Sequence, residues 1–299
     1  MNLALYKEFD EYKDIKEINK GWSNDFKYIA TFSNKKVIIR ISDIKYYEKR
    51  KQQYEYLKIL NNKNLNIPRT IAFGILDNQY VYTILTYLEG EDANDIITSY
   101  SEEKQYQLGI QAGNILKEIN NTKITRNKKT WYQRYQTKIA NKIEKSKEYQ
   151  SIIPEYHRII NYIYQNMALV KYRRDFLCHT DFHLGNMVIY NEQIYVIDFD
   201  KMGLEDNYGE FKPFIWNVMK SIPFQNGLIN SYFNNKVPDQ FFKVLALYAA
   251  ESIISHIPWA HGFNEKEVLV ALEVANQTLS YFDNFNQYIP TWYKDYQYE

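Results

Sequence analysis

The stretch "LCHTDFHLGNMVIYNEQIYVIDFDK", residues 177–201, places two histidines and three aspartates in a segment that otherwise has the composition of β-strands. Asp181 is followed five positions later by Asn186, and Asp198 comes after the next apolar run. Transfer of a γ-phosphoryl group needs an acid that orients or deprotonates the attacking hydroxyl, and oxygen ligands that hold magnesium against the phosphates. The segment therefore predicts phosphoryl transfer, with Asp181 as the base or orienter and Asn186 and Asp198 as metal ligands.

The spacing of these residues shares its frame with the protein-kinase signatures H-R-D-x-x-x-x-N and D-F-G. In this chain Thr180 takes the place of the arginine, and Asp200 takes the place of the glycine. Nothing after Asp198 resembles an activation segment that ends in A-P-E. This favours a small molecule over a protein as the phosphoryl acceptor.

The chain before this segment has the pattern of a small, mainly antiparallel sheet with one helix. Residues 26–32 and 36–42 are rich in β-branched and aromatic side chains, and the turn-forming residues between them predict a hairpin. A helix is predicted over residues 46–61, and a second hairpin is expected to turn at Asp77 and Asn78.

Beyond Gly90 the apolar periodicity becomes helical, interrupted only by the polar segment quoted above. Helices are expected around residues 130–148, 153–168, 209–221, 239–256 and 265–281. The pattern predicts an α+β protein with a nucleotide-binding amino-terminal lobe, residues 1–88, and a larger helical lobe for catalysis and substrate binding, residues 89–299.

Composition narrows the choice of partners and compartment. The 299 residues carry a formal charge of +1, so no overall field attracts nucleic acid or an anionic membrane. The basic stretch 122–147 has helical apolar spacing and is expected to be an amphipathic helix. The single cysteine, Cys178, and the lack of a long apolar segment favour a cytoplasmic location. We expect a monomer whose partner is a small-molecule substrate.

The catalytic segment resembles that of the aminoglycoside phosphotransferase and choline kinase family, whose usual pattern is H-G-D-x-x-x-x-N followed by a hydrophobic strand and I-D-F/W. The resemblance covers nearly the whole chain. "NKGWSNDFKYIATF" is similar to the family's nucleotide-loop hairpin, and "VIIRIS" to the strand with its phosphate-binding basic residue. "YEYLKIL" resembles the helix with the paired acid, and "YTILTYLEGE" the hinge against which adenine lies.

This resemblance implies a protein-kinase-like fold and a magnesium-dependent kinase that uses ATP or GTP, as in enzymes of antibiotic resistance. His179 would brace the catalytic loop rather than react. The implied nucleotide site contains Gly21 and Ser23 in the loop, Arg40 on the phosphates, Glu55 paired with Arg40, and the backbone of Thr86 and Leu88 against the purine. Two positions depart from the family pattern, since Thr180 replaces glycine and Arg40 replaces the more common lysine.

Aminoglycosides and choline are cations, so the resemblance also favours a cationic acceptor. Acidic residues that could line a cation site are Asp200, Glu205, Asp206, Glu210 and Glu251. Two alternatives remain. A non-catalytic kinase-like module would bind ligand without turnover, and a metallohydrolase would use His179, Asp181 and His183 to hold zinc or iron.

Overall fold

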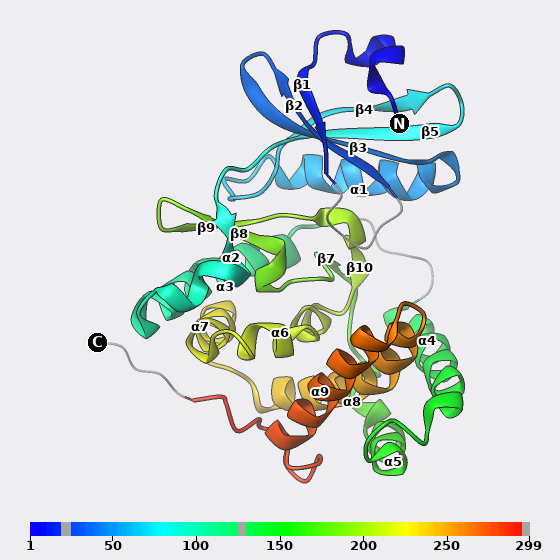
Figure 1. Cartoon of the computed structure of the whole chain (residues 1–299). Coiled ribbons are helices and arrows are strands. Elements are labelled where there is room, and N and C mark those ends of the chain that lie inside the picture. Colours follow the sequence, from blue (N-terminus) through cyan, green and yellow to red (C-terminus); the bar gives the residue numbers. More distant parts are fainter. Residues whose placement is uncertain (19–24, 125–129, 295–299) are drawn as a thin grey trace. The chain divides into compact units, whose positions relative to one another are not determined.

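The computed structural model describes residues 1–18, 25–124 and 130–294. The chain forms two compact units, each built from two stretches of sequence (Figure 1). Unit 1 comprises Met1–Ala93 and Asn186–Met202, and unit 2 comprises Asn94–Gly185 and Gly203–Glu299.

Unit 1 is built on a five-stranded antiparallel sheet of order β1-β2-β3-β5-β4. Its strands are β1 (Lys13–Glu17), β2 (Phe26–Phe32), β3 (Lys35–Asp43), β4 (Thr70–Leu76) and β5 (Tyr80–Thr86). Both predicted hairpins are confirmed, and each turns through two residues with positive φ, Ser33 and Asn34 in one and Asp77 and Asn78 in the other. Such turns match the twist of the flanking strands. Strand β1 was not predicted.

Buried and less buried side chains alternate along β3, so the two faces of the sheet have different surroundings. Val37, Ile39 and Ile41 are buried and join the core beneath the amino-terminal segment, together with Leu3 and Phe9. Because successive side chains of a strand point to opposite faces, Arg40 lies on the other face. Helix α1 (Tyr47–Leu60) follows β3 and packs on β4 and β5.

A second, three-stranded sheet completes unit 1. It contains β6 (Glu91–Asp92), β8 (Met187–Tyr190) and β9 (Gln193–Val196), with β8 in the centre. The backbone N–H of Val196 donates to the carbonyl of Asn66 at 2.9 Å, which joins the β8–β9 hairpin to the amino-terminal part of the chain. The predicted lobes, 1–88 and 89–299, would place this hairpin in the carboxy-terminal lobe, whereas in the structure it packs in unit 1.

Unit 2 is mostly helical. Its described helices are α2 (Ala93–Ile96, which begins at the last residue of unit 1), α3 (Glu102–Asn120), α4 (Trp131–Ser146), α5 (Tyr156–Asn166), α6 (Phe214–Val218), α7 (Ile222–Tyr232), α8 (Asp239–His261) and α9 (Glu265–Tyr281). Strand β7 (Phe176–Cys178) pairs with β10 (Gly203–Glu205). The helix predicted over residues 209–221 is divided into a 3-10 segment, Asn207–Phe211, and the short α6. Helix α7 was missed; it begins after Ser221, whose hydroxyl accepts the N–H of Phe224 at 3.0 Å.

Helices α3 and α7 pack closely because glycines line their contact. A Cβ atom added at Gly109 would clash with the carbonyl oxygen of Phe224, and one at Gly227 with the carbonyl oxygen of Tyr106. The backbones therefore approach to a separation that no larger side chain permits. Helix α3 also contacts β7, the strand that leads into the segment 179–185.

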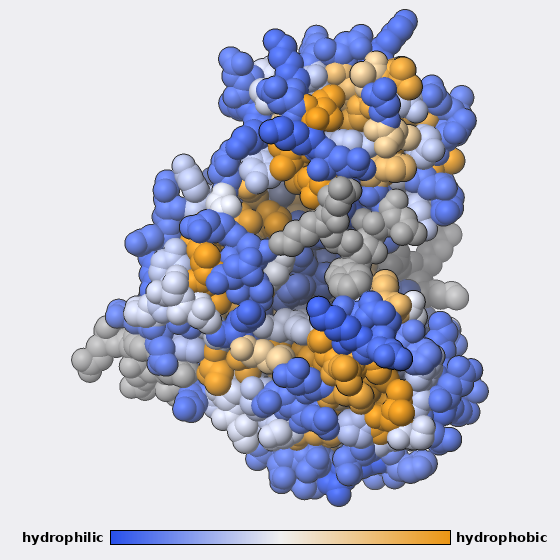
Figure 2. Space-filling view, viewed as in Figure 1, coloured by the Kyte–Doolittle hydropathy of each residue, from blue (hydrophilic) through white to orange (hydrophobic). Residues whose placement is uncertain are grey.

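The surface of the molecule is largely hydrophilic on the face shown in Figure 2, where apolar residues of unit 2 gather over α9. Leu269 of that helix is 66% exposed. Within the described ranges, no helix combines the length and apolarity needed to cross a membrane.

We expect Gly109→Ala to lower the free energy of unfolding by about 1–3 kcal/mol, because the added methyl group forces α3 and α7 apart. Urea denaturation at constant pH measures the effect. The matched control is Gly209→Ala, where the new atom would meet Lys212 Cε at 3.7 Å in ordinary contact. Equal stability of the two variants would contradict the close-packing argument.

Candidate active site

The two predicted metal ligands lie at the same end of the β8–β9 hairpin. Met187 pairs with Val196, and one step further the carbonyl of Asn186 accepts the N–H of Ile197 at 2.9 Å. Asp198 is the next residue, and its backbone is left-handed, with φ 60° and ψ 65°. A non-glycine residue held in this region stores strain, which is common at functional sites. The Asp198 side chain is 40% exposed and can reach a ligand.

Beside Asp198 lies a group of five charged residues, which we call the acid–arginine cluster: Asp25, Arg40, Arg50, Asp198 and Asp200. Arg40 donates through Nε to Asp25 at 2.6 Å, lies 3.7 Å from Asp198 through Nη1, and is paired with Asp200. Arg50 of α1 donates to the same Asp25 oxygen at 2.5 Å. One carboxylate thus holds two guanidinium groups in place.

The acid–arginine cluster brings two guanidinium groups close together, and its three carboxylates offset their charge. Lys27 lies opposite Arg40 in the β2–β3 pair. Burial, followed by the neighbouring Arg50, lowers the pKa of Arg40, and burial and Arg40 lower the pKa of Lys27. Cations that are partly stripped of water and face one another are stabilised by an added anion. Neither Asp25, Arg50 nor Lys27 was predicted as a site residue.

The predicted pair between Glu55 and Arg40 is absent. Glu55 is exposed on α1, and the buried face of that helix presents Gln53 instead, whose amide donates to the carbonyls of Asp200 and Met202. Positions two apart on a helix differ by about 200°, so Glu55 and Gln53 point in nearly opposite directions. The acid that pairs with Arg40 comes from Asp25, just before β2, rather than from the helix.

The remaining predicted nucleotide contacts are only partly described. Gly21 and Ser23 lie outside the residues that the structure describes. The N–H of Thr86 donates to the carbonyl of Arg69 at 2.9 Å and is therefore used within the sheet. The backbone of Leu88, by contrast, makes no hydrogen bond to another described residue.

In unit 2, a buried carboxylate accepts hydrogen bonds from the backbone of the segment after β7. Glu210 is 1% exposed and accepts the backbone N–H groups of His179 at 2.6 Å and Thr180 at 2.7 Å, together with the amide of Asn120 at 3.3 Å. Thr180 has φ 69°, a conformation that glycine adopts without cost and a β-branched residue does not. This explains why a glycine is usual at this position in the family pattern.

Asp181 follows this support. Its N–H donates to Nδ1 of the fully buried His179 at 3.3 Å, so the imidazole braces the loop. Oδ1 of Asp181 lies 3.7 Å from Nε2 of His183, whose Nδ1 accepts the N–H of Gly185. Among the residues that the structure describes, no three His, Cys, Asp or Glu side chains form a metal-binding group, which argues against the metallohydrolase alternative.

The acids expected to line a cation site all have partners within the chain. Asp200 belongs to the acid–arginine cluster, and Glu210 holds the loop. Asp206, 1% exposed, accepts from Arg173 Nε at 2.8 Å and from the Tyr248 hydroxyl at 2.6 Å. Glu205 accepts from the Trp131 indole at 2.9 Å and lies 3.3 Å from Lys138, and the fully buried Glu251 pairs with Lys142 and Lys212. None of the five is an unpaired carboxylate.

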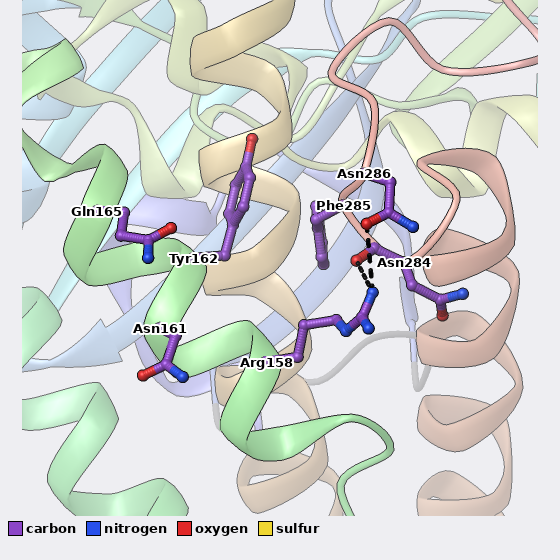
Figure 3. Close-up of a pocket in the computed structure, with 7 residues that line it drawn as sticks. All are labelled: Arg158, Asn161, Tyr162, Gln165, Asn284, Phe285 and Asn286. Carbon is purple, nitrogen blue, oxygen red and sulfur yellow. Dashed lines mark hydrogen bonds between the residues drawn. The ribbon is translucent and has the colours of Figure 1, made fainter.

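An open, polar hollow lies elsewhere in unit 2, between α5 and the segment that follows α9 (Figure 3). Arg158 crosses it to the carbonyl of Asn284 and the amide oxygen of Asn286, each at 3.4 Å. It contains none of the predicted site residues, and its one charged group, Arg158, is engaged with Asn284 and Asn286, so we assign it no function.

Comparison with known proteins identifies a matching family and structural counterparts. The model of the family described as "Phosphotransferase enzyme family" matches residues 14–227. The aminoglycoside phosphotransferase APH(2'')-IIa in its gentamicin complex superposes with a TM-score of 0.66 at 17% identity, covering 93% of this chain and 96% of the other. The GDP complex of aminoglycoside 2'-phosphotransferase-IIIa gives 0.69 at 11% identity, with 92% and 95% covered.

Spectinomycin phosphotransferase APH(9)-Ia, solved with ADP and spectinomycin, gives a TM-score of 0.63 at 17% identity and covers 93% of this chain and 98% of the other. No curated protein matches the sequence. At these identities the solved structures establish the fold, and they confirm the predicted α+β, protein-kinase-like architecture.

We expect Asp25→Asn to destabilise unit 1 by about 3 kcal/mol, because it leaves two nearly buried guanidinium groups without their shared carboxylate. Chemical denaturation measures this loss. The control is Asp43→Asn, whose pair with Lys45 is 50% and 64% exposed and should contribute far less to stability. A loss at Asp25 no larger than at Asp43 would show that the shared carboxylate does not hold the cluster together.

Glu210 should make stability depend on pH. Burial raises the pKa of its carboxyl to about 7 from an ordinary 4.5, although the N–H groups of Thr180 and His179 act to lower it. The folded chain thus retains a proton that the unfolded chain releases, so this contribution to stability is complete below the unfolded pKa and is lost as the pH rises through the folded one. Between pH 5 and 8 the loss should reach about 3 kcal/mol. Urea denaturation of Glu210→Gln should show a flatter dependence; an unchanged slope would refute the assignment.

Proposed function

Because the chain belongs to the phosphotransferase enzyme family, we propose that it transfers the γ-phosphoryl group of ATP or GTP to a hydroxyl group of a small molecule, with Mg²⁺ as the cofactor. The observation that supports this most directly is the position of Asn186 and Asp198 at one end of the β8–β9 hairpin, with Arg40 beside Asp198. An amide oxygen, a carboxylate and a guanidinium are the groups that a magnesium–triphosphate requires.

The donor set fits magnesium. Mg²⁺ takes oxygen ligands, binds one or two protein groups and completes its shell with phosphate oxygens and water. Asn186 and Asp198 supply two such oxygens, and in this proposal the ion, when bound, neutralises charge on the phosphates. Arg40 would hold a phosphate oxygen in a bidentate contact, oriented by Asp25, while Lys27 and Arg50 add positive charge next to it.

The nucleotide base would lie against the strand end after β5. Since the N–H of Thr86 is used within the sheet, we expect the backbone of Leu88 to make the contact with the purine. This contact does not discriminate between ATP and GTP, and we propose both as donors.

Asp181 would orient the acceptor hydroxyl and receive its proton as the oxygen attacks phosphorus. Two features support this role: the N–H contact to His179 fixes the backbone of Asp181, and its side chain is 28% exposed and so reachable by a substrate. We also propose a cytoplasmic enzyme, because the donor is a nucleoside triphosphate and the one cysteine is buried and unpaired.

The acceptor was expected to be cationic, as in an aminoglycoside. Two of the structural relatives named above were solved with gentamicin or spectinomycin, so these compounds belong in the first panel of acceptors to be assayed. The internal pairing of the acids in unit 2 does not support the cationic part of that expectation, and the proposed function is therefore a phosphotransferase with a hydroxyl acceptor.

We expect Asp181→Asn to lower turnover by roughly a hundred- to ten-thousand-fold, because the amide keeps the shape of the side chain but accepts no proton. Nucleotide affinity should stay unchanged. Asp198→Ala should instead remove magnesium-dependent nucleotide binding, since a charged ligand of the ion is lost. Calorimetry with ATP and GTP, and phosphate release in the presence of the acceptor panel, separate the two effects.

The control for both variants is Glu55→Gln, which changes an exposed acid of α1 and should leave binding and turnover as in the wild type. Nucleotide binding by the wild type with no turnover for any acceptor would favour the non-catalytic module. Binding that does not depend on magnesium would remove the metal from the proposal.

A further inference from the structure

Five charged side chains of unit 2 form a group that we call the lysine–glutamate wall: Lys138, Lys142, Lys212, Glu205 and Glu251. Lys138 and Lys142 lie one turn apart on α4, and Glu251 comes from the middle of α8. Glu205 ends β10, and Lys212 follows the 3-10 segment Asn207–Phe211. These elements belong to the unit that contains Asp181.

The wall is built onto the supports of the catalytic segment. Strand β10 pairs with β7, which leads directly to His179, and Glu205 stands opposite Phe176 in that pair. Glu210, which holds the N–H groups of His179 and Thr180, lies two residues before Lys212. Two elements of the wall, β10 and the 3-10 segment before Lys212, therefore also support the segment that contains Asp181.

Within the wall, lysine ammonium groups already occupy both carboxylates. Lys142 Nζ lies 2.6 Å from Oε1 of Glu251, and Lys212 Nζ lies 3.3 Å from each Glu251 oxygen. Lys138 Nζ lies 3.3 Å from Glu205. Although burial acts to raise it, Lys212 and Lys142 lower the pKa of Glu251 to about 2, so this acid is ionised and fully committed to its partners.

The charges of the wall do not cancel. Three lysines face two glutamates, and the nearby Asp206 is neutralised by Arg173 at 2.7 Å. The lysines are also reachable, since their side chains are 48%, 26% and 24% exposed for Lys138, Lys142 and Lys212. An ammonium group of a ligand would have to displace a tethered lysine and would still meet an excess of positive charge.

We propose that the wall selects acceptors that carry no ammonium groups, because lysines of the chain occupy the carboxylates that a cationic acceptor would need. This inference rests on the proposed phosphotransferase function and specifies its substrate class: a hydroxyl compound without amines. Selection works by repulsion as much as by attraction, since like charges placed together penalise the wrong partner.

The experiment uses gentamicin, a polyamine with several hydroxyl groups, as the probe in titration calorimetry. We expect the full-length wild-type chain to bind it with a Kd weaker than about 1 mM, a value that corresponds to a binding free energy of about −4 kcal/mol. The double variant Lys138→Met with Lys142→Met removes the lysine partner of Glu205 and one of the two lysine partners of Glu251. Glu251 keeps its ion pair with Lys212. This double variant should bind gentamicin at least ten-fold more tightly.

Two controls separate charge from other effects. Lys145→Met removes an exposed lysine of the same helix, and Lys138→Arg with Lys142→Arg keeps the charges of the wall; both should bind gentamicin as weakly as the wild type. Micromolar binding by the wild type, or no gain in the double methionine variant, would overturn the proposal. If the double variant does not fold, Lys138→Met alone frees the partly exposed Glu205 and gives the same test.

Magnesium-dependent ATP and GTP binding, measured on the same samples, tests the proposed function independently. Its machinery in unit 1 contains no residue of the wall, so all of these variants should retain it. If the wild type does not bind ATP or GTP, the proposed phosphotransferase function is refuted. If the wild type binds nucleotide and also binds gentamicin with micromolar affinity, only the proposed charge selection is refuted.

Discussion

The buried carboxylate of Glu210 is the contact on which the segment that contains Asp181 depends. It accepts two successive backbone N–H groups, from His179 and Thr180, at the point where β7 ends and a left-handed residue reverses the chain. Without an acceptor, those N–H groups would be buried and unsatisfied, at a cost of about 1–3 kcal/mol each. The same side chain receives the amide of Asn120 from the end of α3. Helix packing through the α3–α7 glycines is thereby connected to the position of Asp181.

In unit 1, two arginines share one carboxylate. A strand and a helix each contribute an arginine, and a single carboxylate, Asp25, keeps the two guanidinium groups together. Such an arrangement holds more positive charge than one lysine paired with one glutamate, and it lies next to Asp198, one of the two residues proposed to hold magnesium. The charges of Arg40 and Arg50 are balanced in this structure by Asp25, Asp198 and Asp200. A bound triphosphate would compete with these carboxylates for the same arginines.

Local sequence signals predicted strands β2 to β5 and the hairpin turns because these depend on neighbouring residues, such as Asp77 and Asn78. The role of Glu55 was wrongly predicted because similarity to a motif outweighed helical periodicity. Gln53, Leu57 and Leu60 form the buried face of α1, and Glu55 lies about 200° from Gln53. Asp25 could not be identified from spacing, since its partners lie 15 and 25 positions away. The pairing of the unit 2 acids with lysines likewise depends on tertiary contacts, such as that between α4 and α8.

Thr180 has a consequence for how sequences of this kind change over evolutionary time. Its left-handed backbone is tolerated because Glu210 and the packing around it hold the loop in place. A glycine at position 180 would adopt the same backbone without strain, and the loop would then need less external support. The effect of any substitution at position 210 therefore depends on which residue occupies position 180. This is epistasis with a preferred order: an earlier change of threonine to glycine removes the strain, so a later change of the glutamate costs only its hydrogen bonds, whereas the reverse order meets both costs at once.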